Sequence, residues 1–205
     1  MRAAVIDYDL GNLPSVTKAV ERIGVETTIV DGPDGFDDSF DAVILPGVGH
    51  FGAGARNLAE RKLSDPLRDW AGRGRPLLGI CVGLQLLLET SEEDPDARGL
   101  GIVPGTVCRL DGGTDLKIPH MGWNSLEVSE DAEVLDAIRP DDLVYFVHSY
   151  YVEPELESVV ATTTYAQRFC SAIERDNVVG VQFHPEKSAD VGRRVLQRFF
   201  DRIGK

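Results

Sequence analysis

Short apolar runs alternate with amphipathic stretches from the N-terminus to Thr90. Continuous runs rich in Val, Ile and Leu predict buried strands, and they lie at 3–7, 26–30, 42–45 and 76–79. Apolar residues with helical spacing predict helices at 14–23, 53–61, 65–71 and 84–88. This alternation indicates an α/β fold in which helices cover both faces of a mostly parallel sheet.

The pattern changes after Thr90, where turns separate short strands without intervening helices. Strands are expected at 101–110, 126–128, 144–147, 159–163, 171–174 and 178–183, and a final helix at 190–203. No internal repeat or linker divides the 205 residues, which suffice for one sizeable core. We therefore expect a single domain over 1–205, with an open, mostly parallel central sheet, flanking helices and additional short strands in the C-terminal half.

Cys81 lies where the fourth predicted strand turns into a helix, within Gly79-Ile80-Cys81-Val82-Gly83. A sharp strand-to-helix turn that pushes a nucleophile outward needs glycines around it, because larger side chains would collide with neighbouring backbone. The positive end of the following helix would favour a thiolate over a thiol. Taken alone, the motif fits a nucleophilic cysteine and a small buried apolar cysteine about equally well.

His184 and Glu186 can complete such a site. His184 follows the last predicted strand directly, Pro185 prevents the strand from continuing, and Glu186 comes next. Cysteine chemistry at neutral pH needs a base to take the thiol proton and an acid to orient that base. Taken singly, a histidine at position 184 would more often be a core residue whose hydrogen bonds are satisfied, and an acid at 186 a surface residue, than members of a catalytic site. Together with the cysteine turn in an α/β chain, they favour a Cys81-His184-Glu186 triad.

The stretch Gly47-Val48-Gly49-His50-Phe51-Gly52 follows a predicted strand and precedes a helix, as a dinucleotide-binding fingerprint does. We reject that interpretation because the acid expected about 20 residues later, at the end of the next strand, is missing. Asp65 and Asp69 lie instead in a predicted helix. The glycine-rich turn can provide backbone N–H groups for half of an oxyanion hole next to Cys81.

Composition and charge exclude several functions. The net charge of -13 argues against a nucleic-acid partner or an anionic membrane surface. The three cysteines are widely spaced and form no ligand pattern with the four histidines, so neither a disulfide framework nor a metal site is expected. No apolar run reaches membrane-spanning length, and the apolar run at the N-terminus is interrupted too early for a signal peptide. We therefore expect a cytoplasmic protein.

The balance among the charged residues suggests adaptation to a salty cytoplasm. Only 5 of the 21 basic residues are Lys, and Asp outnumbers Glu by 20 to 14. The alternative is an ordinary acidic surface.

The stretch from Gly79 to Gln85 and the motif His184-Pro185-Glu186 resemble those of the class I (triad) glutamine amidotransferases. Within that family, the chain is similar to the subunits that supply ammonia to a synthase in histidine biosynthesis. Two blocks point to these subunits: Met121-Gly122-Trp123-Asn124 and His148-Ser149-Tyr150-Tyr151. Further similar stretches are Asp7-Tyr8, Gly11-Asn12-Leu13, Ser15-Val16, Pro46 to Gly49 and Gly180 to Ser188.

The resemblance implies that Cys81 is the nucleophile, His184 the base and Glu186 its orienter. Around the glutamine it implies Gln85, Glu93 and the backbone of Ser149 and Tyr150. Around the oxyanion it implies the backbone of Gly47, Val48, Gly49 and Val82, and at the partner interface Met121, Trp123 and Lys187. Gln85 could instead be a simple helix-face residue and Glu93 a loop acid. No cofactor is implied.

The sequence departs from the family pattern at four positions. Asp9 stands where a glycine is common and Ala55 where a methionine is common, and Val82 and Leu84 replace a frequent leucine and methionine. The last three changes are apolar and mild. Because of Asp9, the contacts of the first loop do not follow from the resemblance.

The implied partner is a (β/α)8-barrel subunit, in a heterodimer, that uses ammonia to make imidazole glycerol phosphate and an aminoimidazole carboxamide ribonucleotide. One alternative is the glutaminase of another synthase, such as that for pyridoxal phosphate, in which the context of Trp123 and Lys187 is not expected. A second alternative is a catalytically dead binding subunit. The intact Cys81, His184 and Glu186 argue against it.

Overall fold

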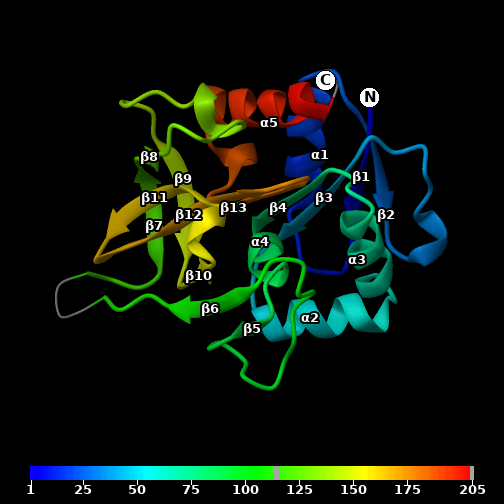
Figure 1. Ribbon diagram of the computed structural model, residues 1–205, viewed down its shortest axis with the longest axis horizontal. Helices are drawn as coiled ribbons and strands as arrows, with labels where there is room; N and C mark the ends of the chain where they lie inside the picture. The colour runs from blue at the N-terminus through cyan, green and yellow to red at the C-terminus, as the bar shows by residue number, and fades with distance from the viewer. Residues whose placement is uncertain (113–115, 204–205) are drawn as a thin grey trace.

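A computed structural model describes residues 1–112 and 116–203 of the chain. Within that part, an eleven-stranded sheet crosses the molecule and a two-stranded sheet lies beside it (Figure 1). The strands are β1 (Arg2–Ile6), β2 (Glu26–Val30), β3 (Ala42–Gly47), β4 (Leu77–Cys81), β5 (Thr90–Ser91), β6 (Gly105–Arg109), β7 (His120–Asn124), β8 (Glu127–Val128), β9 (Val144–His148), β10 (Tyr150–Pro154), β11 (Val159–Tyr165), β12 (Gln167–Arg175) and β13 (Val178–Val181).

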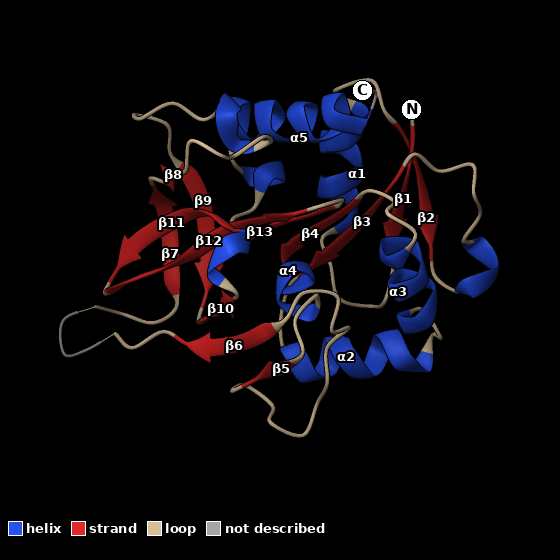
Figure 2. Ribbon diagram, viewed as in Figure 1, coloured by secondary structure: helices blue, strands red, loops and turns tan. Residues whose placement is uncertain are grey.

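Helices cover both faces of the parallel half of the sheet, in which the strand order is β2-β1-β3-β4-β13. One face carries α1 and α5, and the other carries α2, α3 and α4 (Figure 2). The helices are α1 (Leu13–Glu21), α2 (Phe51–Glu60), α3 (Ser64–Gly72), α4 (Val82–Leu86) and α5 (Ala189–Ile203). Short 3-10 turns are η1 (Pro33–Gly35), η2 (Leu135–Ala137), η3 (Leu156–Ser158) and η4 (Pro185–Lys187).

Burial on both faces explains why the central strands read as continuous apolar runs. Every residue of β3, β4 and β13 is buried. In α5 the apolar residues recur three and four positions apart, so Val195, Leu196, Phe199 and Phe200 are buried while the charged face stays in solvent. The expectation of a mostly parallel central sheet with flanking helices is confirmed.

The C-terminal half continues the sheet with antiparallel strands. β12 pairs antiparallel with β13, β10 and β11, and the sheet ends at β6 and β5. β12 ends at Arg175 and β13 begins at Val178, so the hairpin between them turns at 176–177. The two-stranded sheet pairs β7 antiparallel with β9.

Three strands were absent from the sequence-based expectation, namely β5, β7 and β10. The first has only two residues, and β7 contains Gly122 at φ 134°, so neither has the β-branched alternation of a typical strand. β10 follows β9 after the single residue Ser149, and the pattern predicted only the first strand of this pair.

The helix expected at 84–88 lies two residues earlier. β4 continues through Cys81 and α4 begins at once at Val82, because the turn between them consists of Cys81 alone. The strand expected from Gly101 begins only at Gly105. The N–H groups of Leu100 and Ile102 donate instead to Leu86 O at 2.7 Å and Leu87 O at 2.9 Å, which satisfies carbonyls at the end of α4.

The surface of the described residues is rich in Arg-carboxylate pairs. Arg73 and Arg75 share Asp38 at 2.9 and 2.8 Å, and Arg193 and Arg194 both pair with Asp190. Exposed pairs of this kind contribute about 0–1 kcal/mol each. None of the helices in the described residues has both the length and the hydropathy needed to cross a membrane.

The excess of acids predicts a salt-dependent stability. With a net charge of -13, self-repulsion weakens the compact state at low ionic strength, and screening relieves it. We expect the midpoint of thermal unfolding to rise as NaCl increases from low to molar concentration. A midpoint that does not respond to salt would contradict adaptation to a salty cytoplasm.

Candidate active site

Cys81 occupies a strained turn between β4 and α4. Its φ of 55° and ψ of -111° lie in a region that residues with a side chain rarely adopt, and such a conformation costs about 1–3 kcal/mol. The side chain is 3% exposed. The backbone therefore has the form of a nucleophile elbow, which directs the thiol away from the sheet.

Two glycines let the backbone pack this closely around Cys81. A Cβ on Gly83 would overlap the carbonyl oxygen of Leu45 in β3, and a Cβ on Gly79 would lie 2.8 Å from the Cα of Leu84. No side chain fits at either position without moving the main chain. The steric argument made from the sequence for Gly79 and Gly83 is confirmed.

His184 and Glu186 form a buried pair. The Nδ1 of His184 lies 2.8 Å from the Oε1 of Glu186, and the two side chains are 1% and 2% exposed. His184 precedes η4 and Glu186 lies within it. The strand expected at 178–183 ends at Val181, so two residues separate His184 from β13, which is the parallel neighbour of β4. The pairing of β13 with β4 therefore brings His184 to the same edge of the sheet as Cys81.

The main chain of His184 is fixed from two sides. Its N–H donates to the carbonyl of Tyr145 in β9 at 2.9 Å, and its carbonyl accepts from the hydroxyl of Ser188 at 2.7 Å. That hydroxyl in turn accepts from the N–H of Tyr145 at 2.9 Å. Ser188 is fully buried, and it locks the histidine turn against β9.

The protonation of His184 is shifted toward the charged form. Burial lowers its pKa, but the interaction with Cys81 and the hydrogen bond to Glu186 outweigh this and raise the pKa to about 9. Among the described residues, His184 Nε2 and Glu186 Oε2 have no hydrogen-bond partner. Glu186 therefore orients the imidazole through Nδ1, while Nε2 makes no hydrogen bond to any described residue and interacts with Cys81 only at longer range.

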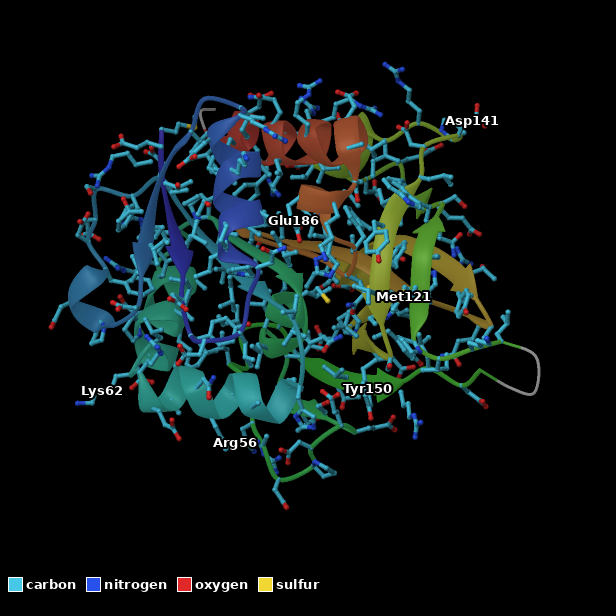
Figure 3. All side chains as sticks on the ribbon, turned by 180° about the vertical axis from the view of Figure 1, so that it is seen from behind. Arg56, Lys62, Met121, Asp141, Tyr150 and Glu186 are labelled. Atoms are coloured by element: carbon cyan, nitrogen blue, oxygen red, sulfur yellow. The ribbon has the colours of Figure 1, made fainter. Side chains whose placement is uncertain are left out.

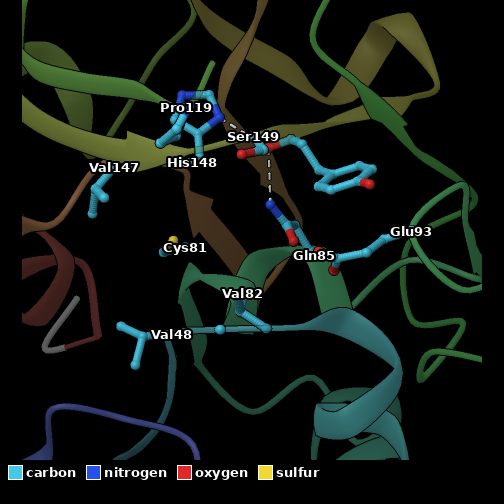
Figure 4. Close-up of a pocket in the computed structure, with 11 residues that line it drawn as sticks. Val48, Cys81, Val82, Gln85, Glu93, Pro119, Val147, His148 and Ser149 are labelled. Carbon is cyan, nitrogen blue, oxygen red and sulfur yellow. Dashed lines mark hydrogen bonds between the residues drawn. The ribbon is translucent and has the colours of Figure 1, made fainter. Parts of the chain in front are cut away.

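A cavity of about 250 Å³ opens in front of Cys81 (Figure 4). The expected residues among its lining are Val48, Gly49, Cys81, Val82, Gln85, Glu93, Ser149 and Tyr150, and the others are Pro119, Val147 and His148. Gln85 donates from Nε2 to the carbonyl of Tyr150 at 3.0 Å, so it is a buried wall of the cavity rather than an ordinary helix-face residue. The candidate site residues from the two halves of the chain thus come together.

Glu93 lines this cavity and also caps a helix. Its Oε2 accepts from the N–H of Phe51 at 2.6 Å, in the first turn of α2. In a dinucleotide site the pyrophosphate would lie at such a helix N-terminus, and here the carboxylate of Glu93 takes that position.

Gly47, the first residue expected around the oxyanion, lies beside Cys81. It pairs with Cys81 in the register of β3 and β4, and a Cβ on Gly47 would meet the Tyr8 hydroxyl and the N of Gly83. Tyr8 donates to the carbonyl of Pro46 at 2.7 Å. Burial raises the pKa of Tyr8, and the charge of Cys81 raises it further. Gly49, with φ at 106°, gives the turn a conformation that favours glycine.

Met121, Trp123 and Lys187, the expected interface residues, lie together on one exposed face. Met121, labelled in Figure 3, and Trp123 are 62% and 52% exposed on β7. Lys187 is exposed in η4. The Lys187 Nζ lies 5.7 Å from the ring centre of Tyr145, which contacts Trp123 edge to face at 6.0 Å. This face lies outside the cavity lining.

The departures from the family pattern have simple structural reasons. Asp9 has a φ of 65°, which glycine and then Asp tolerate best, and Arg61 donates from Nε and Nη2 to its carboxylate at 3.0 and 2.6 Å. Asp9 therefore contacts α2 and not the cavity lining. Ala55 packs against the core from α2, and Val82 and Leu84 are buried in α4.

Two polar residues at the site were not predicted as site residues from the sequence. Gln182 is fully buried, and its Nε2 lies 3.6 Å from the Cys81 Sγ. His148 lines the cavity and bonds from Nδ1 to the Tyr150 carbonyl at 2.9 Å. The signal for Gln182 is a polar residue in the otherwise apolar run from Val178 to Phe183. Across the described residues, no group of three His, Cys, Asp or Glu side chains could hold a metal ion.

Comparisons with known proteins agree with this geometry. A family model described as "Glutamine amidotransferase class-I" matches residues 4–203. The chain is 49% identical to "Imidazole glycerol phosphate synthase subunit HisH" of Aquifex aeolicus (strain VF5), over 97% of this chain and 96% of that protein. It is 46% identical to the protein of the same name from Halobacterium salinarum (strain ATCC 700922 / JCM 11081 / NRC-1), over 96% and 91%.

Solved structures share the fold at lower identity. A glutamine amidotransferase crystal structure superimposes with a TM-score of 0.76 at 20% identity, covering 98% of this chain and 99% of that one. A chain in the structure of PurLQS from Thermotoga maritima gives 0.77 at 23% identity, covering 98% of both.

The pairing of His184 with Glu186 predicts a pH-dependent stability. Because the pKa of His184 is raised from 6.5 to about 9 in the folded protein, its stabilising contribution is complete below about pH 6.5 and is lost as the pH rises through about 9. Because Cys81 raises the pKa of His184 more than Glu186 does, we expect Glu186→Gln to remove only part of this contribution, which is about 3 kcal/mol at most. The measurement is the free energy of unfolding by urea from pH 6 to 10, in both proteins. Parallel curves would show that the pair does not titrate as described.

Proposed function

The chain belongs to the class-I glutamine amidotransferase family, among its HisH subunits, and from this premise we propose that it hydrolyses the side-chain amide of glutamine with Cys81, His184 and Glu186. The observation that carries the proposal is the buried His184–Glu186 pair, 2.8 Å apart, at the sheet edge where the strained Cys81 turn opens onto a cavity. A buried ion pair costs desolvation, and a cysteine with positive φ costs strain, so an arrangement with both is typical of a catalytic site.

In the proposed reaction, His184 Nε2 holds the proton taken from the Cys81 thiol, and the sulfur attacks the amide carbon of glutamine as a thiolate. The carbonyl oxygen becomes an oxyanion, and it collapses to a thioester as His184 returns the proton to the leaving nitrogen, which departs as ammonia. Water, deprotonated by His184, then cleaves the thioester to give glutamate and free Cys81. Glu186 holds the imidazole and stabilises its charged form throughout.

The backbone of two turns would stabilise the oxyanion. The N–H of Val82 begins α4 directly after Cys81, and the turn from Gly47 to Gly49 lies beside it. Preorganised N–H donors stabilise the charge that develops in the transition state. The glycine turn can also change conformation easily, so its N–H groups can point away at rest and toward substrate when the partner's ligand is bound.

Gln85, Glu93 and the backbone of Ser149 and Tyr150 would hold the glutamine. Because both Nε2 hydrogens of Gln85 are engaged by protein acceptors, its Oε1 is left to accept from the substrate. Glu93 brings a negative charge suited to the α-ammonium group.

We further propose that ammonia passes to a (β/α)8-barrel synthase subunit bound at the face of Met121, Trp123 and Lys187. This partner would use ammonia to make imidazole glycerol phosphate and an aminoimidazole carboxamide ribonucleotide in histidine biosynthesis. Two large apolar side chains more than half exposed on one short strand support an interface there. The similarity to HisH proteins favours this synthase over that for pyridoxal phosphate, and the complete triad disfavours a dead binding subunit.

Replacing Cys81 tests the nucleophile. Cys81→Ala should lower glutamine-dependent synthesis by the complex about 10³-fold or more, while synthesis from free ammonium salts is kept, because only amide hydrolysis needs the thiolate. His184→Ala should be nearly as damaging, and Glu186→Gln milder. The measurement is glutamate release and product formation with each nitrogen source. Loss of both activities in a folded complex, or Glu186→Gln as the most severe change, would contradict these roles.

Lys187 tests coupling between the two subunits. Lys187→Ala should weaken association with the synthase, or reduce the stimulation of glutaminase by the synthase ligand, while Cys81 keeps its reactivity toward iodoacetamide. The matched control is Lys62→Ala, which removes the same charge at the end of α2, away from the face of Met121 (Figure 3). Equal stimulation and equal association in wild type and Lys187→Ala would show that Lys187 has no part in coupling.

A further inference from the structure

A line of polar side chains, partly buried at Asn124 and buried at His120 and His148, connects β7 with the cavity. Asn124 Nδ2 lies 3.3 Å from His120 Nε2, His120 Nδ1 lies 3.0 Å from His148 Nε2, and His148 Nδ1 lies 2.9 Å from the carbonyl of Tyr150. His120 and His148 are 2% and 5% exposed, in a cluster with the rings of Phe146 and Phe169. Polar groups inside an aromatic cluster are costly to bury unless each one is hydrogen-bonded. It therefore matters which atom donates and which accepts in each of these bonds.

Backbone groups fix the direction of every bond in this line. Asn124 Oδ1 accepts from the N–H of Ser125 at 2.9 Å, and its Nδ2 donates to the carbonyl of Thr164 at 3.2 Å, so the amide cannot be turned around. The Nδ2 therefore donates to His120 Nε2, His120 Nδ1 donates to His148 Nε2, and His148 Nδ1 donates to Tyr150. Burial lowers the pKa of His120 to about 4 and that of His148 to about 3, which keeps both rings neutral with one N–H each.

The line continues from Tyr150 to the sulfur. The carbonyl of Tyr150 also accepts from Gln85 Nε2 at 3.0 Å, which fixes the amide of Gln85. The same Nε2 donates to Gln182 Oε1 at 3.1 Å, which in turn fixes the amide of Gln182. Gln182 Nε2 then directs an N–H at the Cys81 Sγ, 3.6 Å away.

We propose that Gln182 is a further catalytic residue, whose amide N–H stabilises the Cys81 thiolate, and that His148 and His120 are positioning residues that keep this amide turned toward the sulfur. The proposal rests on the proposed role of Cys81 as nucleophile. Hydrogen bonds to a charged acceptor are stronger than those to a neutral one, so the contact gains strength as the thiol ionises.

The alternative orientation shows what the histidines add. If the Tyr150 carbonyl turned away, Gln85 could rotate its amide by half a turn and offer Oε1 to Gln182. Gln182 would then rotate as well, and its own Oε1 would face the sulfur, where it repels a thiolate. The donor Nδ1 of His148, set by His120, therefore helps to hold the Tyr150 carbonyl in the position that keeps a donor toward Cys81.

The first test compares Gln182→Met with wild type. Methionine keeps the volume of the buried side chain and removes the donor. We expect alkylation of Cys81 by iodoacetamide at pH 7 to slow about tenfold or more, with the difference disappearing at alkaline pH, where the thiol ionises without help. Alkylation of the full chain is followed on the peptide that contains Cys81. The other two cysteines compete little for the reagent, because burial raises the pKa of Cys108 and Cys170 to about 12 and keeps both thiols protonated. The control is the exposed Gln197→Met on α5.

The second test separates the effect of the hydrogen-bond donor at His148 from the effect of ring packing there. His148→Phe keeps an aromatic ring among Phe146 and Phe169 but donates nothing to Tyr150, whereas His148→Asn places an amide Nδ2 where the donor Nδ1 was. We expect the phenylalanine variant to slow alkylation at pH 7 as Gln182→Met does, and the asparagine variant to stay within about threefold of wild type. His120→Phe should follow His148→Phe. In the complex, the same variants should lower kcat for glutamine hydrolysis more than they raise KM.

The titratable groups around Cys81 are His184, from the turn after β13, Tyr8, from the loop after β1, and the cavity-lining Glu93 and His148. All four are unchanged in Gln182→Met, so a shift in its pH profile reports on the amide alone. The two His148 variants both lack the imidazole, so the difference between them reports on the donor to Tyr150. Wild-type alkylation rates in Gln182→Met, or equal rates in His148→Phe and His148→Asn, would overturn the proposal. Failure of the proposed function would be distinct, since wild-type protein in its complex would then release no glutamate from glutamine.

Discussion

The close approach of β3, β4 and α4 at Cys81 is the constraint on which the site depends. The sulfur can leave the plane of the sheet only because Gly83 lies against the carbonyl of Leu45 with no side chain between them. The strain at Cys81 persists because both neighbours of β4 are parallel strands that are buried along their length. The rigidity of the central sheet is thus what holds the nucleophile in a conformation that it would not adopt alone.

The sequence was informative where local chemistry and local structure coincide. Glycines two residues before and after Cys81 have a steric explanation, and the proline after His184 begins the turn η4, so both turns could be predicted. The continuous apolar runs identified the parallel strands for the same reason, since burial on both faces removes polar positions.

Other features depend on partners that lie far along the chain. Gln182 looks like one polar residue in a strand, and its contact with Cys81 arises only because β13 pairs with β4. Glu93 caps α2 from a loop that follows 42 residues later, a relation with no local signal. The strand β7 was missed because its shape comes from pairing with β9 rather than from its own residues.

The main chain at Tyr145 has a mechanical consequence. Its carbonyl accepts from the N–H of His184, and its N–H donates to the Ser188 hydroxyl that holds the His184 carbonyl, so one residue of β9 grips both ends of the histidine. The ring of the same residue lies at the surface beside Trp123 and Lys187. Tyr145 therefore joins the surface to the site: its ring contacts Trp123 and Lys187, and its main chain holds the main chain of His184, once directly and once through the Ser188 hydroxyl.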